Sequence, residues 1–150
     1  MRVALDTNVM AYAEGVDDEV TQARAIAIIE NLSPGGTVIP AQALAELFNV
    51  LVRKGFSREL ARVALLRWQD GYPVIETDRG ILLNAAQLAV DHQLRIWDSI
   101  ILASSSRVGC RVLLSEDFQD GFTWGDVTVV NPFAVNPHPL LQLLFSAGSA

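Results

Sequence analysis

The most constraining feature of this sequence is the apolar run 3–5, which ends directly in Asp6. Such a run, with a β-branched valine in it, is typical of a strand buried on both faces of a sheet. Thr7 and Asn8 follow, and both residue types favour the start of a helix. A carboxylate at this junction lies where open α/β sheets bind ligands. Asp6 is therefore either a ligand-site residue or only the cap of the next helix, and other carboxylates converging on it would favour the first interpretation.

Strand-like and helix-like segments alternate along the rest of the chain. We expect helices at residues 9–13, 18–32, 41–54, 57–70, 78–93 and 96–108, and short strands at 37–39, 74–75, 111–115 and 127–130. This alternation predicts an α/β fold, with a parallel sheet covered by helices on both faces. At 150 residues the chain is expected to be a single domain, 1–150, in which 132–150 is a C-terminal tail or terminal helix.

The apolar spacing also predicts which helix faces are buried. In the helix 57–70, with Ser57 as its N-cap, the apolar face is expected to hold Leu60, Val63, Ala64 and Trp68. The helix 96–108 is apolar almost all round, which predicts burial on all sides. The apolar run 140–145 is expected to be a helix docked on this chain or on a neighbour.

Two further aspartates stand at positions like that of Asp6. Asp98 lies in an apolar segment, where an unpaired carboxylate costs several kcal/mol unless a cation or hydrogen-bond donors compensate it. The alternative is a helix N-cap at Trp97 or Asp98. Asp117 follows the strand 111–115, close to Glu116 and Asp120, and the alternative there is an acidic surface turn.

Glu46 is the fourth acid of interest. Helical geometry places it in a row with Gln42, Asn49 and Arg53, opposite the apolar stripe of the helix 41–54. Such a row is either a solvated face or the wall of a groove. In the second case Glu46 reaches the same crevice as the three aspartates.

Clustered carboxylates stay ionised together only if a hard cation neutralises them. A set of oxygen ligands without His or Cys favours Mg²⁺ or Mn²⁺. Such a metal activates water and stabilises the attacking and leaving oxygens in phosphodiester hydrolysis. No Ser/His or Cys/His arrangement competes for the role of nucleophile.

Composition limits the remaining possibilities. The net charge of −6 argues against a general nucleic-acid coat protein, which would be basic. The lone Cys110 forms no intrachain disulfide, and no Cys/His cluster has zinc spacing. Acidic residues interrupt the N-terminal region, and no apolar run approaches the ~18 residues of a membrane span. We therefore expect a soluble, cytoplasmic protein without a membrane partner.

The acidic segments together resemble those of PIN-domain ribonucleases, most closely the VapC-type toxins of toxin–antitoxin pairs. The matching segments are Leu5-Asp6-Thr7-Asn8, Ala45-Glu46, Ile96-Trp97-Asp98-Ser99-Ile100-Ile101 and Leu113-Leu114-Ser115-Glu116-Asp117-Phe118. They occur in the order and at the spacing of that family, and the resemblance covers nearly the whole chain.

The resemblance implies a three-layer α/β/α fold and a metal-dependent endoribonuclease. Its acidic quartet falls on Asp6, Glu46, Asp98 and Asp117, and its supporting polar positions on Thr7, Asn8 and Ser115. Glu116 and Asp120 are near enough in sequence to replace or assist Asp117. The resemblance also implies a homodimer and a small antitoxin protein as partner.

An acidic site that cleaves RNA needs a basic approach. The window 53–67 has a local charge of +4 and contains Arg53, Lys54, Arg58 and Arg62. These side chains are candidates to bind RNA phosphates or antitoxin carboxylates. The alternative is a solvated helix face.

Three other functions stay open at the level of sequence. The first is a catalytically inactive PIN-like module that binds RNA or protein, and the second is a housekeeping PIN nuclease. The third is a phosphatase with Asp6 as nucleophile. Phosphatases of the haloacid dehalogenase type usually carry a second Asp two residues on, where this chain has Asn8.

Overall fold

The computed structural model describes residues 1–148, and within them six strands form one sheet in the order β3-β2-β1-β4-β6-β5. The strands are β1 (Val3–Leu5), β2 (Thr37–Pro40), β3 (Val74–Ile75), β4 (Val112–Leu114), β5 (Thr123–Trp124) and β6 (Val127–Val130). The helices are α1 (Thr7–Ala13), α2 (Glu19–Glu30), α3 (Ala41–Arg53), α4 (Arg58–Gly71), α5 (Arg79–His92), α6 (Ile96–Arg107) and α7 (Pro139–Gly148), with a 3₁₀ turn at Pro34–Gly36.

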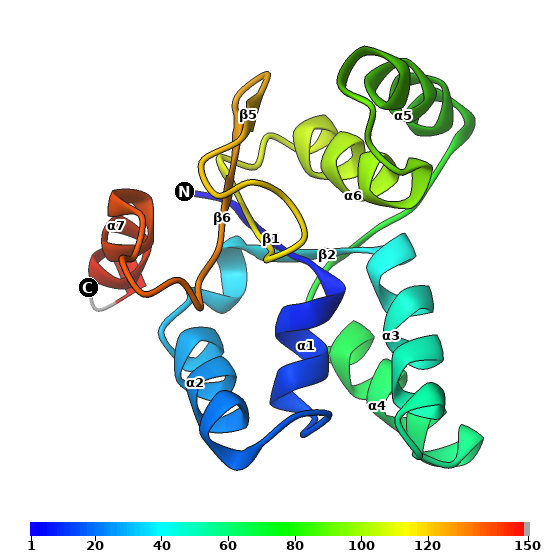
Figure 1. Ribbon diagram of the computed structural model, residues 1–150, viewed down its shortest axis with the longest axis vertical. Coiled ribbons are helices and arrows are strands. Elements are labelled where there is room, and N and C mark those ends of the chain that lie inside the picture. The colour runs from blue at the N-terminus through cyan, green and yellow to red at the C-terminus, as the bar shows by residue number, and fades with distance from the viewer. Residues whose placement is uncertain (149–150) are drawn as a thin grey trace.

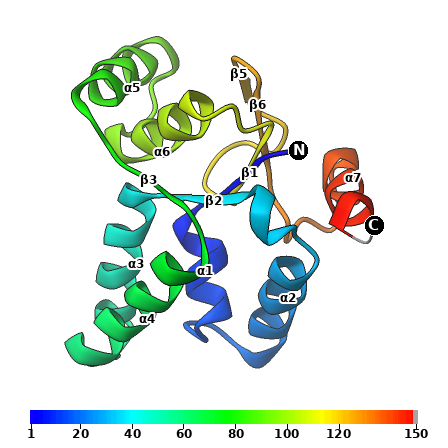
Figure 2. The same cartoon turned by 180° about the vertical axis from the view of Figure 1, so that it is seen from behind.

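The order of the strands explains the layers. The chain steps outward from β1 to β2 to β3 and then returns across the sheet to β4, all in parallel pairs. Because parallel crossovers are right-handed, this reversal places the later helices on the opposite face. Figure 1 shows α1 to α4 on one side of the sheet and α5 and α6 on the other. In Figure 2 the chain leaves α4 through β3 and enters the layer of α5. The predicted three-layer α/β/α fold is confirmed.

The same reversal defines a crevice. Strands β1 and β4 are parallel neighbours, and each is buried along its whole length. The connections leave them towards opposite faces, so a crevice opens outside their carboxyl ends, where sheets of this kind bind ligands. Asp6 follows β1 directly and Ser115 follows β4 directly.

Side-chain caps begin several of the helices. Asp18 accepts a hydrogen bond from the backbone N–H of Thr21 at the start of α2, and Ser57 accepts one from Leu60 at the start of α4. These bonds satisfy backbone donors that have no partner within the helix. The predicted N-cap at Ser57 is confirmed.

Strand β5 is the part of the sheet that the sequence did not predict. It pairs antiparallel with β6, with Trp124 opposite Val127 across a turn at Gly125 and Asp126. Gly125 has a φ of 57°, which suits the tight hairpin turns that need left-handed residues. The strand is only two residues long, too short to produce a recognisable alternation.

The predicted apolar face of α4 is wrong in part. Leu60 and Val63 are 59% and 47% exposed, whereas Ala61 and Ala64 are buried against the core. Small alanine side chains let α4 pack closely on α3, whereas Leu60, Val63 and Leu66 face outward. Trp68, also predicted on the buried face, is partly buried against the core. A pattern of hydrophobicity does not distinguish these faces, because apolar residues occur on both.

Helix α6 is buried from Ser99 to Ser105, as its composition predicted, but Ile96 and Trp97 at its start are exposed. Helix α7 docks on its own chain through Leu141 and Leu144. The expected tail 132–150 also includes 149–150, which lie outside the described residues. Among the residues described, no helix combines the length and apolarity needed to cross a membrane.

Candidate active site

Asp6 is held at the end of β1 by three hydrogen bonds. Its backbone N–H donates to the carbonyl of Leu114, at 3.0 Å, and so continues the pairing of β1 with β4. Its carboxylate is buried, with Oδ1 2.6 Å from the N–H of Thr7 and Oδ2 2.6 Å from the hydroxyl of Ser115. Asp6 is therefore the N-cap of α1 and also the centre of contacts between the two central strands.

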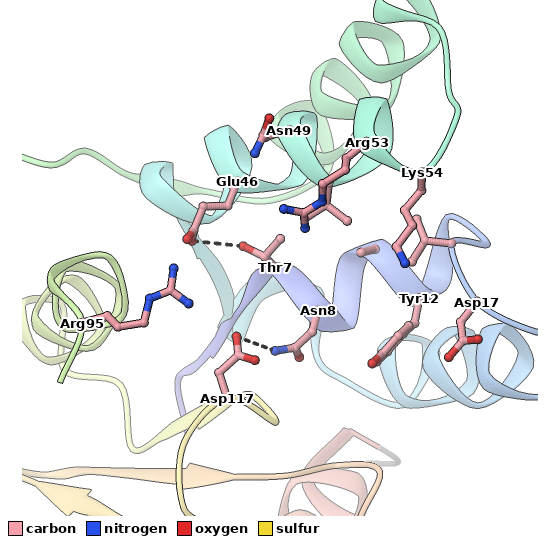
Figure 3. Close-up of a pocket in the computed structure, with 13 residues that line it drawn as sticks. Thr7, Asn8, Tyr12, Asp17, Glu46, Asn49, Arg53, Lys54, Arg95 and Asp117 are labelled. Atoms are coloured by element: carbon pink, nitrogen blue, oxygen red, sulfur yellow. Dashed lines mark hydrogen bonds between the residues drawn. The ribbon is translucent and has the colours of Figure 1, made fainter.

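The loop after β4 brings Asp117 beside this carboxylate. The backbone N–H of Asp117 donates to Oγ of Ser115 at 3.1 Å. The side-chain amide of Asn8 donates to Oδ2 of Asp117, also at 3.1 Å (Figure 3). Two bonds thus position Asp117 against the start of α1, although the residue is exposed in the irregular loop after β4.

Glu46 approaches from α3. Its Oε2 lies 3.4 Å from the hydroxyl of Thr7, which also lies 3.1 Å from the carbonyl of Ala43 (Figure 3). Thr7 therefore holds the first turn of α1 against α3 at the point where Glu46 projects. The row Gln42, Glu46, Asn49 and Arg53 lines cavities, which agrees with the groove interpretation.

Asp98 lies in the first turn of α6 and is half-buried. The N-cap of α6 is Arg95, so the alternative that Trp97 or Asp98 caps the helix is wrong. The Asp98 carboxylate contributes to the electrostatic environment of Glu46 and is itself affected by Asp117.

Burial gives Asp6, Glu46 and Asp98 raised pKa values. Burial is the main cause that raises the pKa of Asp6 to about 7. Hydrogen bonds from Ser115 and Thr7 lower this pKa, whereas the charges of Asp117 and Glu46 raise it further. Burial and then the charge of Asp98 raise the pKa of Glu46.

Burial and then the charge of Asp117 raise the pKa of Asp98. The guanidinium of Arg95 opposes the shifts of the Glu46 and Asp98 pKa values. The carboxyls therefore share a site in which nearby positive charges and hydrogen-bond donors do not fully balance the negative charge.

The chemistry of these donors suits a hard divalent cation, because all the side chains offer oxygen and repel one another. In addition, Oδ1 of Asn8 is buried without a hydrogen-bond partner among the described residues. As the side chains lie, however, no three His, Cys, Asp or Glu groups within residues 1–148 are placed to hold a metal ion. The predicted metal site stays a prediction.

A cleft of about 490 Å³ opens at this edge of the sheet, between α1 and α3 (Figure 3). Its lining residues are Thr7, Asn8, Ala11, Tyr12, Val16, Asp17, Glu46, Asn49, Val50, Arg53, Lys54, Arg95 and Asp117. Asp6 and Asp98 are not among them. Asp6 is fully buried as the N-cap of α1.

The structure divides the four basic candidates into two pairs. Arg53 and Lys54, at the end of α3, line the cleft. Arg58 and Arg62 lie on α4 and are not part of its lining. Of the four basic candidates in the window 53–67, Arg53 and Lys54 are therefore the two that line the cleft.

Glu116 and Asp120 are engaged elsewhere. Glu116 accepts a hydrogen bond from the hydroxyl of Tyr12, which ties the β4 loop to α1. Asp120 accepts one from the backbone N–H of Asn131, at 2.8 Å, outside the cleft. Neither residue lines the cleft as Asp117 does.

The sequence did not single out Tyr12, Asp17 or Arg95, although all three line the cleft. Tyr12 stands four residues after Asn8, so helical spacing places both on one face of α1. Arg95 stands three residues before Asp98, and this spacing, close to one helical turn, could have identified it as a neighbour of the site. Asp17 lies in the loop after α1, where no periodic pattern marks it.

Comparison with known proteins identifies the family of this fold. Residues 3–119 match the family model of the PIN domain. No curated protein matches the sequence.

Several solved structures have the same fold. The Mycobacterium tuberculosis VapC20 toxin, described as cleaving the sarcin–ricin loop, has a TM-score of 0.67 at 17% identity, covering 77% of this chain and 89% of its own. A toxin–antitoxin complex from Klebsiella pneumoniae has a TM-score of 0.66 at 19% identity, covering 89% and 99%. FitAcB from Neisseria gonorrhoeae has a TM-score of 0.65 at 19% identity, also covering 89% and 99%. The family match spans all four acidic positions and the crevice between β1 and β4, and the chain therefore belongs to the PIN domain family.

Proposed function

We propose that this protein is a metal-dependent endoribonuclease that hydrolyses RNA phosphodiester bonds. One observation carries the proposal: hydrogen bonds from Ser115, Asn8 and Thr7 hold the carboxylates of Asp6, Asp117 and Glu46 at the crevice where the sheet reverses. Asp98 adds a fourth carboxylate, whose charge acts on Glu46. These four residues are the proposed metal-holding and catalytic groups. A binding module would gain nothing from placing mutually repelling acids together.

Mg²⁺ or Mn²⁺ held by these carboxylates would activate water and stabilise the charge that develops on the phosphate. The remaining polar residues position the acids. Ser115 orients the carboxylate of Asp6, Asn8 orients that of Asp117, and Thr7 lies against that of Glu46. Such supports keep catalytic groups in one geometry and reduce the reorganisation needed during reaction.

The cleft offers an approach for RNA in a protein that is acidic overall. Arg53 and Lys54 lie in its wall at one end and Arg95 beside Glu46 (Figure 3). These cations would bind phosphates on both sides of the acidic residues. Local positive charge in the cleft offsets the repulsion that the net charge of −6 exerts on RNA.

We further propose that the chain is the toxin of a toxin–antitoxin pair, acting in the cytoplasm. Two structures similar to this one are described as a toxin and as a toxin–antitoxin complex. The proposed partners are a small antitoxin protein and a second copy of the chain. Exposed apolar residues of α4, namely Leu60, Val63 and Leu66, form a surface that such partners would cover.

The decisive experiment incubates the wild type and Asp98→Asn with a mixed set of structured RNAs in Mg²⁺, Mn²⁺ or EDTA. The proposal expects discrete cleavage that needs metal and disappears in the variant, while circular dichroism shows that the variant is folded. Cleavage that survives EDTA or the substitution contradicts it. Metal binding without cleavage of any RNA, or no metal binding, leaves the binding module as the better function.

A second experiment separates a toxin from a housekeeping nuclease. Induced expression of the wild type should arrest bacterial growth, and Asp6→Asn should not. Unimpaired growth with an active wild-type enzyme would favour the housekeeping role.

A further inference from the structure

A second, smaller cavity of about 280 Å³ adjoins the cleft. It is lined by Gln42, Ala45, Glu46, Asn49, Arg95 and Trp97. Glu46, Asn49 and Arg95 also line the main cleft, so the two cavities meet at these side chains. A polymer that places one phosphate at Glu46 would therefore extend naturally from the main cleft into the smaller cavity.

Trp97 forms one wall of this cavity. Trp97 is 48% exposed, although residues 99–105 of the same helix are buried. Within residues 1–148 it stacks on no aromatic ring and donates no hydrogen bond. An exposed indole offers a large flat apolar surface, of the kind on which nucleic-acid bases stack.

Arg95 lies where the cavities meet. Its charge partly opposes the rise in the pKa values of Glu46 and Asp98 that burial causes. Even so, among the described residues no carboxylate lies within ion-pair distance of its guanidinium; the ion pairs found join Arg67 to Glu14 and Arg107 to Asp78. Figure 3 shows the Arg95 side chain directed into the cleft. Its donors therefore remain available for another anion, and a guanidinium matches the geometry of a phosphate.

Two amides complete the cavity. Gln42 and Asn49 lie on the same face of α3 as Glu46, one on each side of it. An amide side chain offers both donors and an acceptor, which is what the edge of a base requires. An indole, a guanidinium and two amides thus surround one space next to the acidic residues.

We infer that the smaller cavity is a nucleotide subsite next to the bond that is cleaved. The base stacks on Trp97, its edge contacts Gln42 or Asn49, and its phosphate binds Arg95. The inference rests on the proposed nuclease function and adds a substrate class. The RNA must be single-stranded here, because a base paired in a duplex cannot turn its face to an indole.

The polar lining favours a nucleotide over a protein partner. Of the residues around the cavity, only Ala45 and Trp97 are apolar. The centres of protein interfaces are depleted in charged residues, and a protein seated here would bury Glu46 and Arg95. A second copy of the chain seated on Trp97 is the competing outcome.

The test measures binding of a hydrolysis-resistant phosphorothioate oligoribonucleotide in Mg²⁺, single-stranded or annealed to its complement. The proteins are the wild type, Trp97→Ala, Trp97→Phe, Arg95→Gln and, as a control, Leu83→Ala. Leu83 is 67% exposed on α5 and lines neither cavity. Fluorescence of Trp97 is obtained as the difference between the wild type and Trp97→Phe.

We expect the single strand to quench the fluorescence of Trp97 and the duplex not to do so. Trp97→Ala should weaken binding about tenfold, whereas Trp97→Phe and Leu83→Ala should bind within about twofold of the wild type. Arg95→Gln should weaken binding and lower the slope of log affinity against log salt by about one.

Wild-type affinity in Trp97→Ala would overturn the inference. So would an altered oligomeric state of that variant in size-exclusion chromatography with unchanged RNA binding, which would assign Trp97 to an interface between copies. The proposed nuclease function fails separately, if the wild type binds the oligonucleotide with quenching but cleaves no RNA. If the wild type neither binds nor cleaves, both proposals are wrong.

Discussion

The hydroxyl of Ser115 donates a 2.6 Å hydrogen bond to Oδ2 of Asp6, across 109 residues of sequence. Each residue directly follows a central strand of the sheet, and both are buried. The bond joins β1 to β4 at the crevice and lowers the pKa of a carboxyl that burial raises.

Loss of this bond should destabilise the protein. Ser115→Ala leaves Oδ2 of Asp6 buried without its donor, which costs about 1–3 kcal/mol. We expect the free energy of unfolding, measured by urea denaturation above the pKa of Asp6, to fall by that amount. Ser104→Ala is the matched control, since Ser104 is buried with no partner for its hydroxyl among the described residues. Equal losses in the two variants would contradict the role of the bond.

The raised pKa of Asp6 predicts how stability depends on pH without metal. Its pKa is about 7 in the folded protein and 3.8 as the unperturbed value, so the folded state binds the extra proton between these pH values. Stability should therefore fall as pH rises from 3.8 to about 7, and the full cost remains at higher pH.

Asp6→Asn removes this dependence while keeping the shape of the side chain. Above pH 7 and in EDTA, the variant should be more stable than the wild type by up to about 4 kcal/mol, and the difference should vanish at low pH. Urea midpoints across the pH range measure both. A variant less stable than the wild type above neutral pH would show that the Asp6 charge is compensated.

Metal binding should raise thermal stability through Asp117 and not through Asp120. A cation at hundredfold its dissociation constant stabilises the folded state by about 2.7 kcal/mol. We expect Mg²⁺ or Mn²⁺ to raise the melting temperature of the wild type and of Asp120→Asn. The Asp120 carboxylate accepts a hydrogen bond from the backbone N–H of Asn131 and does not line the cleft. Asp117→Asn should lose most of the increase. The opposite result would make Asp120 the fourth acid.

RNA affinity should depend on Arg53 and Lys54 more than on Arg58 and Arg62. The first pair lines the cleft and the second does not. Replacing both residues of the first pair with Ala should weaken RNA binding and lower the salt slope by roughly one to two. The double Ala variant of Arg58 and Arg62 has the same loss of charge and serves as control. Equal effects would mean that RNA is attracted by overall charge.

Much of the fold was predictable from local patterns. The buried strand 3–5 with Asp6 at its end, the helices of both layers and the cap at Ser57 all follow from the spacing of apolar and capping residues within a few positions. The positions of the four acids relative to these elements were predictable for the same reason.

The sequence by itself therefore determined the elements, the α/β class and the ends of strands at which carboxylates stand. Only the tertiary structure decided that Ser115 bonds to Asp6, that Tyr12 ties down Glu116, that Arg95 stands between the two cavities and that Ala61 rather than Leu60 faces the core. The physical reason is the distance along the sequence over which each kind of information acts. Periodicity reports which face of an element is apolar, whereas the partner of a side chain depends on which strands become neighbours when the chain returns from β3 to β4.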